Sequence, residues 1–347
     1  TSATADTDLT QTQVTATGAD GATVGAEAHT DVTLDPSDAA FSIAYVQTDT
    51  TSDVTLSGSR VVAVDGLARV DSVVRETQDL NASVGGKTTA ANVAVAVSLR
   101  KSASTLTITG QAAQTAVSGH SGVRSEARSA RNLDFAADAA TGADGYVGLS
   151  AIASYGRAVT RVDLDAPVAV TGATGTVRVR ARTTHIQSAR ALTRSGSPSD
   201  AADDATARSE SLRDQVADLA GDLEEVSATS SSADNEETDA AKSPNVGVTL
   251  ALLAEIQADD TDVAIGANAA AELTGPTVEV TAENDVLSAR GVAAAVAARA
   301  ANDSAGAADP KAASGSEEAT STDVVVSLGY QSWRQDANLG LGGAARL

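Results

Sequence analysis

The sequence contains no cysteine and no methionine, and only two Phe, four Tyr and one Trp occur among its 347 residues. Without cysteine the chain has no disulfide framework, no zinc site with thiolate ligands and no thiol nucleophile. Because few large side chains are available to fill a thick globule, any core must be thin. The 42% hydrophobic content comes largely from Ala and Val, which favours a repeat array with closely spaced backbones.

Positive charge is also scarce, with 24 Lys and Arg against 46 Asp and Glu and a net charge of -22. Phosphate neutralisation needs clustered cations, so the composition argues against nucleic acid or an anionic membrane as a partner. No apolar run reaches the roughly 20 residues that span a bilayer, so we expect no membrane insertion. The first residue is Thr1 and the last ones lie within a repeat, so we expect the chain to be part of a longer polypeptide.

Five sixteen-residue windows align without gaps, each with an alternating apolar segment, a polar stretch, two apolar residues spaced by two, and a small residue. The windows begin at Ile43, Val95, Ala151, Leu252 and Leu328. Their closing apolar pairs are Val54 and Leu56, Leu106 and Ile108, Val162 and Leu164, Val263 and Ile265, and Leu339 and Leu341. A degenerate sixth copy is predicted to close at Val14 and Ala16. Such period-2 spacing is typical of strands with apolar residues on one face.

A second shared block follows the windows and consists of a glycine and a further alternating segment. Gly66, Gly175 and Gly275 begin it, and Gly122 begins a poorer version. Glycines at fixed offsets are expected where a coil turns a corner or needs a positive φ.

The windows start 52, 56, 101 and 76 residues apart, and the intervals become regular when two polar insertions are removed. With residues 194–243 and 297–321 excised, every interval is about 50 residues. We interpret each unit as two coils of roughly 25 residues, which gives roughly ten coils and a rod on the order of 50 Å long.

The predicted fold is therefore all-β, a parallel β-helix (β-solenoid). Its coils cover 1–193 and 244–296, further coils start in 322–347, and 297–321 is a flexible insertion. The alternative is a string of β-sandwich domains, although these normally use a large buried Trp or Tyr.

The acidic insertion 194–243 carries the signature of one amphipathic helix over about 207–228. Its apolar residues follow the 4-3 spacing of a single helix face. They are Leu212, Val216, Leu219, Leu223 and Val226. This face is expected to pack on the solenoid, and the alternative is that it binds a partner.

Segments such as Ala91–Ser98, Thr105–Gly110 and Gly175–Ala181 resemble the repeat regions of giant bacterial surface adhesins of the filamentous-haemagglutinin type. The resemblance extends over nearly all of the chain except the two insertions, and its motifs have low specificity. It implies a right-handed parallel β-helix displayed outside the cell. The family has no catalytic residues to transfer.

Residues that could carry chemistry are few and scattered. His29, His120 and His185 have no second histidine nearby and are expected at the surface or in turns. Asp259, Asp260 and Asp262 form an acidic cluster on a predicted loop, where weak calcium binding is conceivable but solvated carboxylates are the default. No catalytic, cofactor or metal site is predicted.

The expected function is therefore that of a structural or adhesive segment of a large extracellular or cell-surface protein, acting as a rigid rod or display surface. Its partners would be further repeats, copies of itself or cell-surface molecules. The alternative is a carbohydrate-active β-helix enzyme, a lyase or hydrolase, which would need carboxylates gathered in a cleft.

Overall fold

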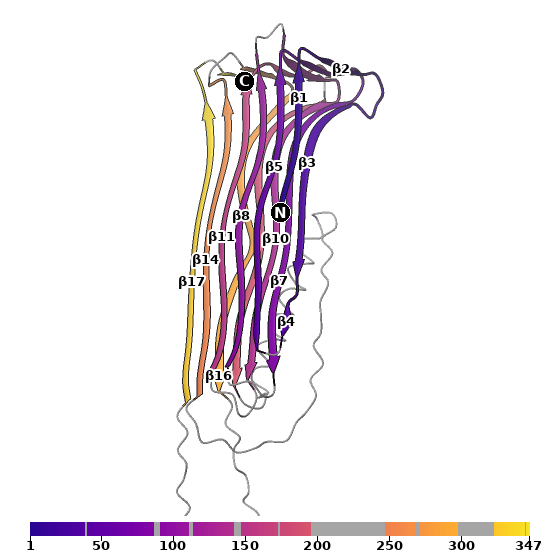
Figure 1. The fold of residues 1–347 in the computed structure, drawn as a ribbon. Helices are drawn as coiled ribbons and strands as arrows, with labels where there is room; N and C mark the ends of the chain where they lie inside the picture. The colour runs from indigo at the N-terminus through magenta and orange to yellow at the C-terminus, as the bar shows by residue number, and fades with distance from the viewer. Residues whose placement is uncertain are drawn as a thin grey trace, which may run out of the picture.

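The computed structural model describes residues 1–38, 40–86, 91–110, 114–141, 147–172, 174–195, 247–267, 271–297, 323–343 and 345–347. In these ranges the chain forms strands and turns, arranged as three all-parallel sheets (Figure 1). The predicted parallel β-solenoid is confirmed, and the alternative of tandem β-sandwiches is wrong because sandwiches are built from antiparallel sheets. The helix predicted at about 207–228 and the insertion beyond residue 297 lie outside the described residues.

Two sheets of long strands face each other, and a third sheet of short strands connects them at one end (Figure 1). Sheet 1 consists of β1 (Ser2–Thr10), β5 (Phe41–Ser57), β8 (Ala91–Thr109), β11 (Val147–Asp165), β14 (Gly247–Ile265) and β17 (Asp323–Leu341). Sheet 2 consists of β3 (Ala22–Leu34), β4 (Ser37–Asp38), β7 (Leu67–Gly86), β10 (Gly122–Thr141), β13 (Thr176–Ser195) and β16 (Thr277–Ala297). The short sheet consists of β2 (Gln13–Ala16), β6 (Arg60–Ala63), β9 (Ala116–Gly119), β12 (Val168–Val170), β15 (Ala271–Thr274) and β18 (Ala345–Arg346).

Each coil comprises one strand of sheet 1, one short strand and one strand of sheet 2. Ile43 in β5 pairs with Val95 in β8, so a single coil takes 52 residues. The prediction of two coils per unit is therefore wrong. Alternation shows which face of a strand a residue lies on, but it does not show where the chain turns. Strands as long as 17 to 21 residues therefore could not be distinguished from two shorter strands.

The alignment of the five windows is confirmed residue by residue. Their first residues form one unbroken row across sheet 1: Ile43, Val95, Ala151, Leu252 and Leu328. The sixth copy is misplaced, because Val14 pairs with Val61 in the short sheet. The true equivalents of Val54 and Leu56 in β1 are Thr7 and Leu9.

The solenoid is broader along its strands than along its axis. A strand of 19 residues is about 60 Å long, whereas six layers stack to about 25 Å at the usual strand spacing. The described coils therefore form a slab, and the predicted rod of about ten coils is wrong.

The interior is thin and its apolar part contains many Ala and Val residues, as predicted, together with buried Leu residues. It contains two apolar blocks at opposite ends of the long strands. The corner block lies beside the short sheet and includes Leu56, Leu106, Ile108, Leu164, Val177, Val179 and Ile265. The distal block includes Leu80, Leu133, Phe135, Ile152, Ala189 and Leu253.

Glycines occupy corners where the chain passes between the long strands and the short sheet. Gly58 has φ +62° and Gly110 has φ +132°, values that side chains with a Cβ rarely adopt. A Cβ at Gly66 would lie 2.5 Å from the backbone nitrogen of Gly21, so this corner requires glycine through close backbone approach.

Two leucines of β8 that face opposite sides provide a test of the core assignment. Leu106 is fully buried in the corner block, whereas Leu99 is 37% exposed on the outer face. We expect Leu106→Ala to lower the free energy of unfolding by about 2–5 kcal/mol because it leaves a cavity. Leu99→Ala should cost less than about 1 kcal/mol. Urea denaturation of both variants measures the difference, and equal losses would contradict the assigned facing.

Candidate functional site

The outer face of sheet 1 carries a contiguous apolar band over the first part of its strands. Four adjacent rows of side chains form it, each row running across five strands. They are Phe41, Val93, Leu149, Leu250 and Val326; Ile43, Val95, Ala151, Leu252 and Leu328; Tyr45, Val97, Ala153, Ala254 and Tyr330; and Gln47, Leu99, Tyr155, Ile256 and Ser332. This band contains no charged residue. Solvent reaches it, because Phe41 is 55% and Tyr330 is 59% exposed.

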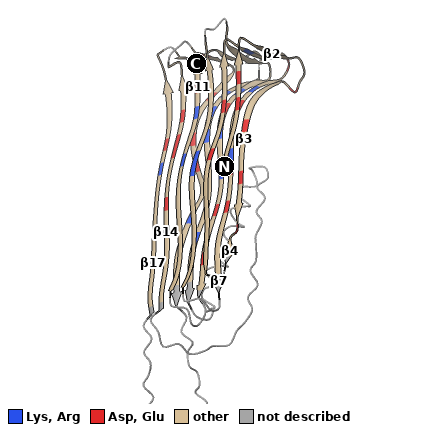
Figure 2. Ribbon diagram, in the orientation of Figure 1, with Lys and Arg blue, Asp and Glu red and all other residues tan. Residues whose placement is uncertain are grey.

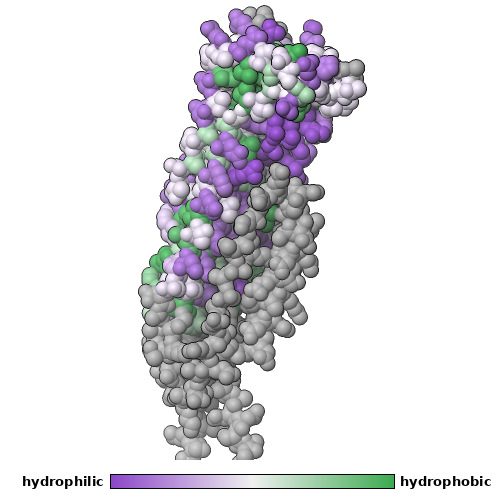
Figure 3. All heavy atoms as spheres, turned by 90° about the vertical axis from the view of Figure 1, so that its right-hand side faces the viewer, coloured by the Kyte–Doolittle hydropathy of each residue, from purple (hydrophilic) through white to green (hydrophobic). Residues whose placement is uncertain are grey.

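The band ends abruptly at a charged row. Asp49, Lys101, Arg157 and Arg334 occupy the next outward position of their strands, and Lys101 lies 3.7 Å from Asp49. Figure 2 shows few charged residues at the lower ends of the long strands, where the band lies. In Figure 3, which views the edge formed by β1 and β3, hydrophobic residues reach the lower left margin of the described surface. An exposed, contiguous apolar patch of this kind is a candidate interaction surface.

The outer face of sheet 2 has the opposite character near the short sheet, where arginines and carboxylates pair between neighbouring strands. Arg178 of β13 lies 2.9 Å from Glu279 of β16, and Arg182 lies 2.8 Å from Asp285. Glu126 is buried beneath Arg124 and Arg128, at 2.7 and 3.5 Å. The outer face of sheet 1 is therefore apolar over the first part of its strands, whereas the outer face of sheet 2 carries a network of ion pairs near the short sheet.

Between the two apolar blocks the interior contains a belt of buried polar residues, which we call the polar seam. Its members come from the inward positions of both long sheets. They are Thr48, Glu76, Gln78, Ser98, Arg100, Arg131, His185, Gln187, Glu255, Gln257 and Asp259. Burying a charge destabilises the fold unless the charge is paired and hydrogen-bonded. The contacts of these groups therefore determine how much the seam costs in stability.

Two arginines of the seam are held by partners from other coils. Arg131 of β10 forms an ion pair with Asp259 of β14, and both side chains are fully buried. Arg100 Nη2 donates to Ser154 Oγ at 3.0 Å and to Gln257 Oε1 at 3.2 Å. Burial lowers the pKa of Arg100 to about 10, so its guanidinium stays charged at neutral pH.

Gly156 leaves the room that Arg100 needs. It lies between Arg100 and Gln257 in the same row of sheet 1. A Cβ at this position would approach Gln257 Oε1 to 2.1 Å and Arg100 Nη2 to 2.8 Å. The guanidinium also lies over the Phe135 ring, 5.2 Å from its centroid, which joins the seam to the distal block.

A second group in the seam is centred on Glu255. Its carboxylate accepts hydrogen bonds from the amides of Gln187 and Gln331. Burial raises the pKa of Glu255 above 4.5, although the two amides and Arg100 act in the opposite direction. Gln187 Oε1 in turn lies 2.8 Å from His185 Nε2.

His185 is held as a neutral imidazole. Its ring packs edge-on against Trp333, with the centroids 4.8 Å apart. Burial, and then the positive charges of Arg131 and Arg100, lower the pKa of His185 well below 6.5. Nε2 therefore carries the proton that it donates to Gln187.

The depressed pKa of His185 predicts a loss of stability in mild acid. Below about pH 6.5 the unfolded histidine takes up a proton that the folded one does not, so stability falls as pH falls. Glu255 acts in the opposite direction, because the folded carboxyl keeps a proton above pH 4.5 that the unfolded one has released. We expect His185→Gln to flatten the pH dependence of the urea midpoint between about pH 7.5 and 5. His29→Gln, at an exposed position of β3, is the matched control. Identical profiles for the two variants would contradict the buried neutral imidazole.

The residues singled out from the sequence are not brought together. Asp259, Asp260 and Asp262 lie in β14, so the predicted loop is wrong. Alternation turns Asp259 inward to Arg131 and the other two outward. No three His, Cys, Asp or Glu residues in the described ranges are placed to hold a metal ion.

All three histidines are expected at the surface or in turns, and this prediction is correct for two of them. His29 is exposed, and His120 is exposed in a turn. The prediction is wrong for His185, which is buried. Its position was readable from the sequence, since it lies an even number of residues after Val177, Val179 and Ala181, which all face inward.

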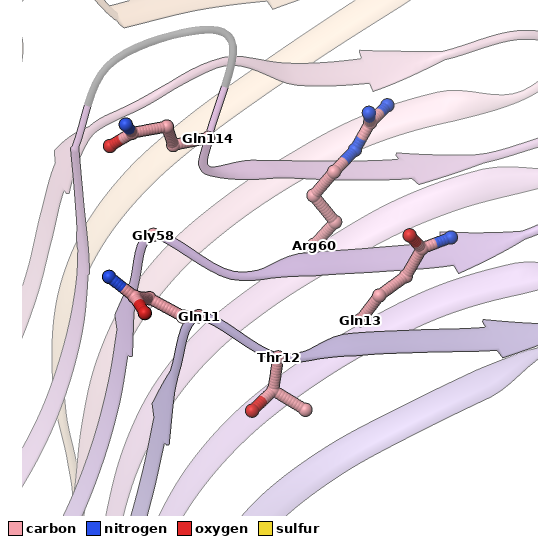
Figure 4. A pocket seen from close by; sticks show the side chains of 6 residues that line it. All are labelled: Gln11, Thr12, Gln13, Gly58, Arg60 and Gln114. Carbon is pink, nitrogen blue, oxygen red and sulfur yellow. The ribbon is translucent and has the colours of Figure 1, made fainter.

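An open hollow lies at the corner where sheet 1 passes into the short sheet (Figure 4). It is lined by amides, a hydroxyl and one guanidinium, from Gln11, Thr12, Gln13, Gly58, Arg60 and Gln114. None of the described residues that line it is a carboxylate, so they do not supply the acid pair that a glycoside hydrolase needs. Over the described part of the chain, the structure contains no helix with the length and hydrophobicity to cross a bilayer.

Comparisons with protein-family models, with curated proteins and with solved structures give no match for this chain. The β-solenoid architecture therefore stands on the strand pairing, and the resemblance to surface adhesins remains an expectation.

Proposed function

We propose that this chain is part of an extracellular structural protein whose coils present a broad, flat face for lateral contact with a second copy. The apolar band on sheet 1 is the observation that carries the proposal. The coils act as a rigid display surface, and further coils of the same polypeptide would extend it along the axis.

The dimensions of a coil favour a display surface over a long stalk. One coil takes 52 residues and adds one strand spacing, a rise on the order of 0.1 Å per residue. An α-helix rises about 1.5 Å per residue. Adding coils therefore gives little length along the axis for the number of residues used. It gives area instead, because each added coil extends a face that is about 60 Å across along the strands.

The area of the band is consistent with pairing of two copies. Four rows about 6.6 Å apart along five strands about 4.8 Å apart cover roughly 600 Å². Two such faces in contact bury about 1,200 Å² in total, at the lower end for specific interfaces. Flat sheets commonly pack face to face, and two copies of the same face can do so about a two-fold axis.

The charges beside the band also favour this partner. The whole chain carries a net charge of -22, which opposes self-association. The row that borders the band, however, contains Lys101, Arg157 and Arg334 against one carboxylate, Asp49. Arg157 and Arg334 are paired with Asp260 and Asp336 of the following row, so the charges nearest the band are largely balanced and add little repulsion between two copies.

Secretion or surface display is supported by composition and by the resemblance to adhesins. An acidic surface favours solubility in the extracellular medium, and the scarcity of cations argues against nucleic acid as a partner.

Charge placed in the band tests the proposed contact. We expect the wild-type chain to dimerise with rising concentration in analytical ultracentrifugation. Ile43→Asp combined with Leu252→Asp should raise the dimer Kd at least about a hundredfold, because four carboxylates would be buried without partners.

The matched control carries the same charges outside the band. Thr55→Asp combined with Ala264→Asp changes outward positions of the same two strands and should leave the dimer intact. A wild-type chain that stays monomeric, or equal association of both variants through the open ends of the sheets, would contradict lateral contact through the band.

A further inference from the structure

One corner of the polar seam brings together a hydroxyl, a carboxylate, a carboxamide and a second hydroxyl. Thr48 lies in β5 of sheet 1, Glu76 and Gln78 lie in β7 of sheet 2, and Ser98 lies in β8 of sheet 1. All four side chains are at most 2% exposed. The group therefore spans the interior between the two long sheets and is sealed from solvent.

Glu76 Oε1 connects the hydroxyl and the carboxamide. It accepts a hydrogen bond from Thr48 Oγ1 at 2.5 Å and another from Gln78 Nε2 at 2.8 Å. Gln78 Nε2 also lies 2.9 Å from Thr48 Oγ1. Glu76 Oε1 thus contacts the hydroxyl of Thr48, which has the chemistry of a nucleophile, and the amide nitrogen of Gln78, which has the chemistry of a leaving group.

The fourth group is placed on the carbonyl side of the carboxamide. Ser98 Oγ donates to Gln78 Oε1 at 2.6 Å. A donor on this oxygen polarises the carbonyl and stabilises the negative charge that forms when a nucleophile adds to it. The four residues therefore have the arrangement of an acyl-transfer site whose substrate is a side chain of the protein itself.

We propose that Thr48 and Gln78 react with each other to form an internal ester. Glu76 takes the proton of Thr48 Oγ1 as this oxygen adds to Gln78 Cδ, and Ser98 stabilises the oxyanion. Glu76 then gives the proton to Nε2 as the Cδ–N bond breaks. The products are a Thr48 Oγ1–Gln78 Cδ ester and one ammonia molecule, and Glu76 is again a carboxylate.

The geometry requires one adjustment before the reaction. Thr48 Oγ1 contacts the amide nitrogen in the plane of the carboxamide, whereas addition occurs at its face. The terminal torsion of a glutamine side chain is broad, so the carboxamide can turn its face to Thr48 once the hydrogen bond from Gln78 Nε2 to Thr48 Oγ1 is given up. Exclusion of water protects the ester from hydrolysis after it has formed.

Other polar groups of the seam lack one of the required partners. The hydrogen bonds described for Gln187 go to His185 and Glu255, and those of Gln257 go to Arg100 and Asp259. These glutamines therefore have an ionisable neighbour but no hydroxyl in hydrogen-bond contact. Thr30 and Thr50 contact each other at 2.7 Å and have no carboxamide in that contact.

The bond would connect the two long sheets within a single coil, across 30 residues of chain. It would fix the spacing of the sheets in the middle of the slab, where charged groups replace apolar packing. This inference does not depend on the proposed lateral contact, since it concerns only the interior.

Intact-mass spectrometry of the purified, folded chain tests the ester. Loss of ammonia lowers the mass by about 17 Da relative to the sequence. Trypsin should then yield Thr1–Arg60 joined to Glu76–Lys87, and hydroxylamine should separate the two peptides. Thr48→Val and Glu76→Gln should each restore the full mass.

Thr50→Val is the matched control, because it removes a buried hydroxyl of the same strand that lies two residues away and bonds to Thr30. It should retain the mass loss and the joined peptides. A folded wild-type chain at its full sequence mass would overturn the proposal. So would a mass loss that maps to another residue, such as an asparagine succinimide. These two readings use the wild-type chain alone and hold even if a variant does not fold.

Discussion

Parallel hydrogen bonding between equivalent strands of successive coils is the constraint on which the other features depend. β10 pairs with β13 over 20 residues without a shift, and the strands of sheet 1 are aligned in the same way. Because the side-chain period of a strand is two, this register fixes the face of each residue along the long strands, except that a bulge at Leu287 shifts the alternation of β16 by one residue. The apolar band, the two core blocks and the polar seam all follow from that one alignment.

The repeat alignment was predictable because it used only matched positions. Sixteen aligned residues were enough to place Ile43, Val95 and Ala151 in one row, as the strand pairing confirms. The same rule, extended along each strand, would also have placed the band. Ile43 and Val54 are an odd number of residues apart in one continuous strand, so they cannot share a face. The apolar residues lie outside in the first part of β5 and inside in the last part.

The inward position of several polar residues was readable in the same way. Asp259 lies four residues before Val263, and Glu76 lies six residues after Val70, both of which face inward. What the sequence could not supply is the partner of each group. Arg131 and Asp259 are 128 residues apart and meet only because the coils stack, and no local pattern connects them. The length of a coil was likewise hidden, since alternation continues across any number of turns.

The polar seam also affects how coils can be added. Charged and amide side chains at fixed depths find partners only when the strands of neighbouring coils are aligned. A slip by two residues would keep every side chain on its face but would move Arg131 from beside Glu76 and His185 to another depth and away from Asp259, its ion-pair partner. The seam thus selects one register among several that the apolar blocks alone would accept.

The orientation of the strand ladders has a mechanical consequence. A tensile load applied along the long strands acts on a whole ladder in shear, so that about twenty backbone hydrogen bonds share the force. A load applied at one corner along the coil axis peels the outermost strand and breaks its bonds in succession. The slab is therefore anisotropic in strength, stiff across its width and weaker between its layers, like a laminate that resists stretching but can be delaminated from an edge.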